Sequence, residues 1–148
     1  MATDTDVTSV LNDLIEICKD GENGFRTAAE KVKEPSLKSL FSKYATQRAQ
    51  YAQELQSAVS RLGGKPETSG HVAAGLHRGW MGLKEALTSD EDKALINEAE
   101  TGEDAAIKAY QNALGKSLPS EVQTLVQKQY AGVQEAHGTV SNLKHSRQ

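Results

Sequence analysis

The sequence predicts an all-α protein, an antiparallel bundle of four long helices with one shorter helix in a crossover connection. Apolar residues recur at alternating spacings of three and four along four long segments, which is the pattern of an amphipathic helix. The chain has 3 prolines among 148 residues, so long segments run without a helix breaker. No segment shows the apolar–polar alternation of a half-buried strand.

The first two helices are expected over residues 6–33 and 36–62, as one hairpin. The residue before Pro35 is pushed out of the helical region, so the first helix ends there and the second begins. Gly63 and the glycine after it stop the second helix. Arg48 is unusual because it places a charge in an apolar seam near mid-helix. The two seams consist of Val7, Leu11, Leu14, Cys18, Gly21, Phe25, Ala28 and Val32, and of Leu37, Phe41, Tyr44, Arg48, Tyr51, Leu55, Ala58 and Leu62.

The remaining helices are expected over residues 71–87, 90–114 and 119–144. The first of these is the crossover helix, and we expect Trp80 to anchor it against the bundle. Pro119 suits the first turn of the last helix, where a backbone N–H has no partner within the helix. The seams of the last two helices consist of Leu95, Ala99, Gly102, Ala106, Tyr110 and Ala113, and of Val122, Val126, Gln129, Val133, Ala136, Val140 and Leu143.

The connections between the helices decide the topology. The turn between the first two helices is short, and so is the turn between the last two, and short turns join antiparallel neighbours. The connection over residues 63–89 is long enough to cross the length of a bundle. A chain of 148 residues can build one such core and is short for two, so we expect a single domain over residues 1–148.

The composition excludes several classes of protein. The net charge is −3, there is no basic block, and lysine and arginine are interspersed with acids, so a nucleic-acid-binding surface is not expected. No apolar run is long enough to span a bilayer, and the first residues lack the features of a signal peptide, so we expect a cytoplasmic chain with no membrane partner. Cys18 is the single cysteine, and its seam position predicts a small buried group. A homo-oligomer and an unidentified protein partner both stay open.

Four side chains are candidates for a metal site in the middle of the bundle. Glu100 and Glu103 lie one turn apart on the fourth helix. His137 lies on the fifth helix, and Glu22 lies near the middle of the first. Carboxylate-bridged metal sites in helical bundles use one glutamate from each of two helices and Glu-x-x-His from the other two. Carboxylates combined with imidazole suit iron or manganese.

The pattern Glu100-x-x-Glu103, followed by Gln134-x-x-His137, resembles the second half of a rubrerythrin-type ferritin-like protein. Over nearly its whole length the chain is also similar to a family of small bacterial ferritin-like four-helix-bundle proteins of unknown function. The segments that carry this similarity are GGKPETSG at residues 63–70, LHRGW at residues 76–80 and EDAA at residues 103–106. The resemblance implies a ferritin-like bundle and implies no particular activity.

The second helix departs from the rubrerythrin pattern. Where that pattern has Glu-x-x-His, this helix has Gln47 and Gln50, whose neutral amides are poor ligands for iron. Arg48 adds a positive charge near the place that a metal cation would take. A ferritin-type storage cage is therefore not expected.

Two interpretations of this polar layer stay open. In the first, Arg48 forms an ion network with Glu22, Glu100 and Glu103, which Arg26 could join, and the protein is a non-catalytic or stress-associated bundle. In the second, the three glutamates and His137 hold one iron or manganese ion, with redox activity toward oxygen or peroxide as a further option.

Overall fold

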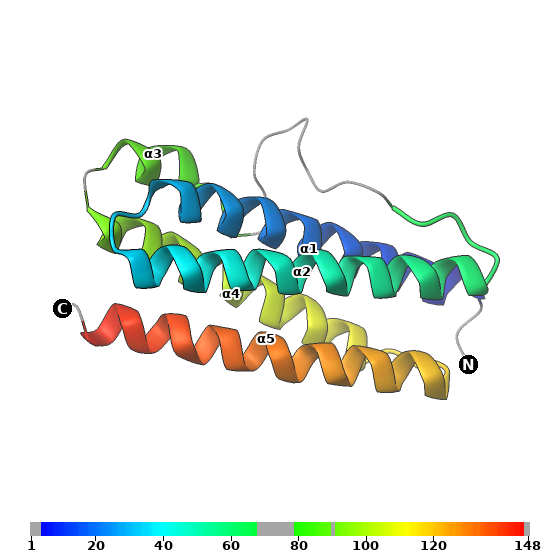
Figure 1. Ribbon diagram of the computed structural model, residues 1–148. Helices are drawn as coiled ribbons and strands as arrows, with labels where there is room; N and C mark the ends of the chain where they lie inside the picture. The colour runs from blue at the N-terminus through cyan, green and yellow to red at the C-terminus, as the bar shows by residue number, and fades with distance from the viewer. Residues whose placement is uncertain (1–3, 68–78, 90, 147–148) are drawn as a thin grey trace.

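The computed structural model describes residues 4–67, 79–89 and 91–146 (Figure 1). Within these residues the chain forms five α-helices and no strand. The helices are α1 (Asp4–Lys31), α2 (Pro35–Arg61), α3 (Leu83–Thr88), α4 (Asp92–Leu114) and α5 (Ser120–Ser146). No helix in the described part of the chain combines the length and the apolar character needed to cross a membrane.

The four long helices pack as two antiparallel hairpins. One hairpin is α1 with α2, the other is α4 with α5, and α1 packs against α4 to join them (Figure 1). The short α3 lies against α4 at the end of the bundle where α1 ends and α2 begins. The predicted all-α bundle is therefore confirmed, and the bounds of its long helices agree with the prediction to within two residues.

The ends of α2 follow directly from its sequence. Pro35 occupies the first turn, where its fixed φ suits a helix and its missing N–H costs nothing. At the other end, Gly63 has a φ of 79°, a value that only glycine adopts without strain. The N–H of Gly63 bonds to the carbonyl of Ser60 and closes the last turn.

The crossover helix is shorter than the sequence predicts. A helix is expected over residues 71–87, but residues 79–82 form a turn and α3 covers Leu83–Thr88. Gly79 has a φ of 93°, far from the right-handed helical region. Its Cα lies so close to the backbone of Thr101 in α4 that a side chain at this position would overlap α4. Residues 71–78 of the predicted helix lie outside the described residues.

Trp80 holds the crossover against the bundle. Its side chain is buried, and its indole fits between Gly24 of α1 and Gly102 of α4, where a Cβ on either glycine would overlap the ring. Phe25 meets the indole edge-on, with 5.1 Å between ring centroids and 74° between ring planes. The two glycines thus create the slot that the indole fills.

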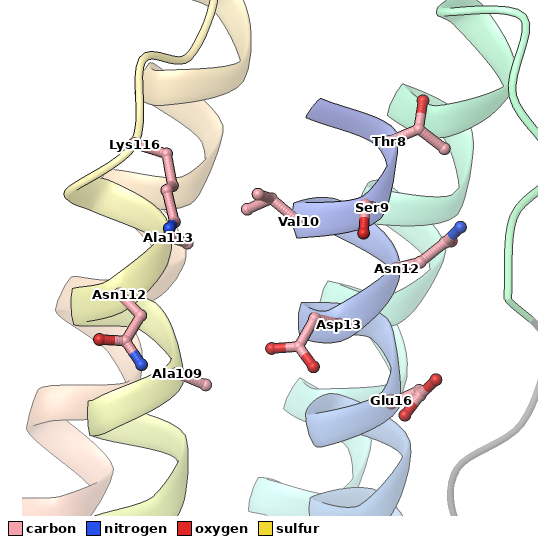
Figure 2. Close-up of a pocket in the computed structure, with 10 residues that line it drawn as sticks. All are labelled: Thr8, Ser9, Val10, Asn12, Asp13, Glu16, Ala109, Asn112, Ala113 and Lys116. Atoms are coloured by element: carbon pink, nitrogen blue, oxygen red, sulfur yellow. The ribbon is translucent and has the colours of Figure 1, made fainter. Parts of the chain in front are cut away.

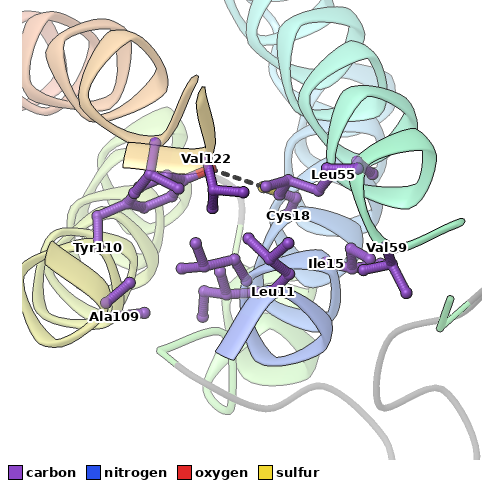
Figure 3. Packing of buried hydrophobic residues seen from close by; sticks show 14 of the residues in the cluster. Leu11, Ile15, Cys18, Leu55, Val59, Ala109, Tyr110 and Val122 are labelled. Atoms are coloured by element: carbon purple, nitrogen blue, oxygen red, sulfur yellow. Dashed lines mark hydrogen bonds between the residues drawn. The ribbon is translucent and has the colours of Figure 1, made fainter. Parts of the chain in front are cut away.

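Two clusters of buried apolar side chains form the core. The first lies at the end of the bundle where α1 begins (Figure 3) and includes Leu11, Ile15, Cys18, Leu55, Val59, Ala109, Tyr110 and Val122. The second lies at the opposite end and includes Phe25, Phe41, Trp80, Leu83, Ile96 and Val140.

A gap without buried members of either cluster separates the two. It falls at residues 19–24 of α1, 46–51 of α2 and 100–105 of α4. Arg48 and Glu103 lie in this gap, and both are buried. The polar layer predicted near the middle of the bundle is therefore present in the fold.

Asp92, at the start of α4, holds the turn between α1 and α2. Its Oδ1 accepts a hydrogen bond from the backbone N–H of Lys33 at 2.8 Å, and its Oδ2 accepts one from the N–H of Glu34 at 3.1 Å. We expect Asp92→Ala to lower the free energy of unfolding by about 1–2 kcal/mol, because two donors lose a charged acceptor. Urea denaturation measures the loss. Glu91→Ala is the control, and equal losses in the two variants would contradict this role.

Candidate functional site

A buried ion pair lies in the gap between the two apolar clusters. Arg48 Nη1 donates to Glu103 Oε1 at 2.5 Å, and Nη2 donates to Oε2 at 2.8 Å. The side chains of Arg48 and Glu103 are 2% and 0% exposed, respectively. Such a two-pronged contact is among the strongest hydrogen-bonded ion pairs in proteins. It also joins the two hairpins, because Arg48 belongs to α2 and Glu103 to α4.

Further contacts surround the guanidinium of Arg48. Its Nε donates to Gln47 Oε1 at 3.1 Å, and its Cζ lies 5.6 Å from the centroid of the Phe25 ring. The ring face adds a cation–π attraction. Burial alone would lower the pKa of Arg48, but the carboxylate of Glu103 more than offsets this effect and raises the pKa. Arg48 is therefore a permanent cation in the core.

Glu22 lies on α1 in the same gap, and its carboxylate is engaged along its own helix. Oε2 accepts a hydrogen bond from Arg26 Nη2 at 2.6 Å, and Oε1 accepts one from Lys19 Nζ at 3.3 Å. Both cations lie about one turn away, which is the spacing at which helical side chains meet. Both oxygens of Glu22 thus have cationic partners within α1.

Glu100 lies at the junction of α4 and α5, where its Oε1 accepts a hydrogen bond from Lys144 Nζ at 2.7 Å. This hydrogen bond is the main reason that the pKa of Glu100 is lowered. Residues three apart on a helix point in directions about 300° apart, or 60° measured the short way. Because of this difference in direction, the Glu100 side chain meets Lys144 of α5 while the Glu103 side chain enters the core.

His137 lies nearer the surface, on α5. Its Nε2 is 2.6 Å from Oδ1 of Asp104, and the two side chains are 30% and 56% exposed. The pair borders a shallow surface groove between α4 and α5. The groove is lined by Asp104, Ile107, Lys108, Gln111, Tyr130, Gln134 and His137. The Gln134-x-x-His137 pattern therefore faces this groove.

The structure gives each of the four candidate ligands a different partner. In the described part of the chain, no three His, Cys, Asp or Glu side chains are placed so that they could hold a metal ion. The donor set found here does not fit iron or manganese, because each candidate carboxylate already neutralises a protein cation. The predicted ion network is present in part: Arg48 binds Glu103 and Arg26 binds Glu22, while Glu100 binds Lys144.

Reasoning from the sequence missed a hydrogen-bond chain inside the first apolar cluster. Tyr110 Oη donates to Gln129 Oε1 at 2.7 Å. Gln129 Nε2 donates to the backbone carbonyl of Tyr51 at 3.2 Å and to Glu54 Oε1 at 2.9 Å, which fixes the orientation of the amide. Because the Tyr110 proton points at Gln129, the Cys18 thiol is the donor in its 3.2 Å contact with Tyr110 Oη (Figure 3).

This chain of hydrogen bonds connects all four long helices. Burial raises the pKa of Cys18 to about 11 and that of Tyr110 well above its ordinary value, so both groups are neutral. Cys18 is 1% exposed, which agrees with the prediction of a small buried group. The signal in the sequence was Gln129, a polar residue in an otherwise apolar seam.

Comparison with known protein families identifies the family of the chain. Residues 6–116 match the model of a domain of unknown function, DUF2383. The chain belongs to the DUF2383 family. A comparison with curated protein sequences finds no match.

The fold of this DUF2383 chain is similar to that of a solved structure. That structure is a two-domain protein from Anabaena variabilis with DJ-1/ThiJ/PfpI-like and ferritin-like domains. The TM-score is 0.78 at 16% sequence identity, and the match covers 99% of this chain and 38% of that protein. The DUF2383 chain thus spans well under two thirds of the length of that two-domain protein. The likeness confirms the ferritin-like fold and, at this identity, carries nothing about activity.

Proposed function

We propose that this DUF2383 protein is a non-catalytic ferritin-like bundle in which the Arg48–Glu103 pair takes the place of a metal ion between the helices. The observation that carries the proposal is the two-pronged, fully buried contact between these side chains. Such a bundle acts by binding other proteins or further copies of itself, and its polar layer serves the fold.

The charge of Arg48 opposes a metal ion in this layer. Two unit charges of the same sign, 4 Å apart, repel by about 4 kcal/mol at the effective dielectric constant of about 20 that describes protein sites. A divalent ion beside Arg48 would meet about twice that repulsion. It would also have to displace Arg48 from Glu103 and leave the guanidinium buried without its partner.

Elemental analysis of protein purified without chelator tests this proposal. We expect far less than one iron or manganese ion per chain, also after incubation with iron(II) under nitrogen and desalting. The competing proposal is a metal site on Glu22, Glu100, Glu103 and His137. It predicts about one ion per chain and a clear loss of metal in His137→Ala and Glu100→Ala, which leave the Arg48–Glu103 pair intact. That result would overturn the proposal that the Arg48–Glu103 pair takes the place of a metal ion.

A further inference from the structure

Hollows flank α4 on both sides in the described part of the chain. The larger one, of about 670 Å³, lies between α1 and α4 (Figure 2), and its carboxylates Asp13 and Glu16 already have partners within the chain. The smaller one, of about 460 Å³, is the groove between α4 and α5 that His137 borders. We call it the α4–α5 groove. It differs from the larger hollow because some of its hydrogen-bonding groups have no partner.

The two ends of the α4–α5 groove are closed by hydrogen-bonded pairs that join α4 to α5. At one end Asp104 pairs with His137, and at the other end Gln111 pairs with Tyr130. The helices run antiparallel, and each advances seven residues from one pair to the other. Seven residues of a helix cover about 10 Å along its axis. The middle of the groove therefore offers two helical turns of surface between fixed ends.

Lys108 of α4 lies between these pairs without a partner. Neither Lys108 nor Gln134, which lines the same groove from α5, forms a hydrogen bond or an ion pair with the residues that the structure describes. Asp104 lies four residues before Lys108, a spacing at which an acid often pairs with a lysine on a helix. Here Oδ1 of Asp104 accepts a hydrogen bond from His137 Nε2 instead, since an ionised carboxylate can only accept. The ammonium group of Lys108 is therefore free to bind a ligand.

Tyr130 supplies a second donor. Its Oη accepts a hydrogen bond from Gln111 Nε2 at 3.0 Å, so its own hydroxyl proton is left to donate. The Tyr130 ring stacks on the buried ring of Tyr110, with 6.4 Å between centroids and 15° between planes. This stacking holds the hydroxyl in place, about one helical turn from the level of Lys108.

The charge around the groove favours an anion. Residues 105–134 contain three lysines and a single acid, Glu121, although the whole chain has a net charge of −3. The groups without a partner are an ammonium, a phenol hydroxyl and an amide, and all of them can donate hydrogen bonds to an anion. Ile107 adds an apolar surface to the groove, where it packs against the first apolar cluster.

We propose that the α4–α5 groove binds a small organic anion. Its oxyanion, a carboxylate or a phosphate group, accepts hydrogen bonds from Lys108 and Tyr130, and its apolar part covers Ile107. The negative charge of Asp104 lies at one end of the groove and keeps the anion in the half nearer to Tyr130. An apolar surface with a few placed polar groups is the usual composition of a small-molecule site. This site does not depend on the buried ion pair in the core.

Proton–nitrogen correlation NMR of the full chain tests the site during titration with phenyl phosphate or with benzoate at constant ionic strength. These probes carry the same ring on the two kinds of oxyanion. We expect at least one of them to cause saturable shifts confined to residues 104–111 and 130–137, and the tighter binder identifies the oxyanion. Shifts that do not saturate, that spread over the whole chain or that are absent with both probes would overturn the proposal.

Two substitutions with opposite expected effects make the test specific. Lys108→Gln removes the free cation, and we expect the dissociation constant to rise by roughly tenfold or more. Asp104→Asn removes the repelling charge but keeps an oxygen that accepts from His137, and we expect the dissociation constant to fall by about threefold. Both side chains are exposed, so both variants should fold.

Two further variants separate the hydroxyl and the position of the charge. Tyr130→Phe keeps the ring and removes the hydroxyl, so we expect binding to weaken by about threefold or more. Lys128 is an exposed lysine of α5 that does not line the groove, and Lys128→Gln should bind as the wild type does. Circular dichroism shows whether each variant is folded. Equal losses in Lys108→Gln and Lys128→Gln, or weaker binding by Asp104→Asn, would contradict the site.

Discussion

Arg48→Met is expected to lower the free energy of unfolding by about 3–5 kcal/mol. The substitution removes the cation from the carboxylate of Glu103, whose side chain is 0% exposed. Methionine fills a similar volume, so the loss reports the unpaired charge and not an empty space. Guanidinium chloride denaturation followed by circular dichroism measures the loss.

A double variant distinguishes the cost of leaving Glu103 without its partner from the cost of losing the whole ion pair. Arg48→Met combined with Glu103→Leu replaces both charges with apolar groups, and we expect stability within about 1–2 kcal/mol of the wild type. The control is Arg26→Met, which removes an arginine that is 55% exposed and pairs with Glu22. Ion pairs at the protein surface contribute about 0–1 kcal/mol. The Glu22 side chain is 11% exposed but keeps its contact with Lys19, so this loss should be small. A double variant as unstable as Arg48→Met would rule out our explanation.

Trp80→Ala is expected to destabilise the fold by about 3–5 kcal/mol, the usual cost of removing a large buried aromatic side chain. The indole is 1% exposed and fills the slot between Gly24 and Gly102. Its removal also leaves Phe25 without its edge-on partner. The turn at residues 79–82 already lies against the backbone of α4, so it cannot move closer to α4 to fill the cavity that the indole leaves.

Glycine substitutions test the slot from its walls. Gly102→Ala places a methyl group inside the indole ring, so either Trp80 or α4 must shift. The chain has one tryptophan, so a red shift of its fluorescence reports whether Trp80 has left the slot. Gly138→Ala is the matched control, since nothing lies within 4 Å of the added methyl group. It should stabilise α5 by about 0.5–1 kcal/mol, and a similar gain in Gly102→Ala would contradict the slot.

The four long helices could be predicted because their signals are local. Apolar spacing sets which face of a helix is buried, and Pro35 and Gly63 mark the ends of α2 through their own backbone limits. The crossover could not be predicted in the same way. Its apolar line extends through Trp80, but Gly79 takes a positive φ because the chain passes close to α4. This close approach is a tertiary contact, and the spacing of apolar residues in the sequence cannot predict it.

The candidate site, too, could be predicted only in part. A charge in an apolar seam predicted that Arg48 is buried, and it is. Its choice of partner could not be predicted, because Glu100 and Glu103 differ by a modest rotation about α4 that the helix packing decides. His137 lies at the right height for the expected layer, but its side chain reaches Asp104 near the surface.

The charged layer between the two apolar clusters also restricts how the hairpins can slide past each other. A slip of one helical turn moves α4 by about 5.4 Å along its axis. It would bring the guanidinium of Arg48 opposite Ala99 or Ala106, which are buried and cannot accept a hydrogen bond through their side chains. Packing between small apolar side chains distinguishes weakly between such offsets, because Ala99 and Ala106 present the same side chain at successive turns. The ionic contact therefore favours one register of the bundle, as do the Trp80 slot and the hydrogen-bond chain through Gln129.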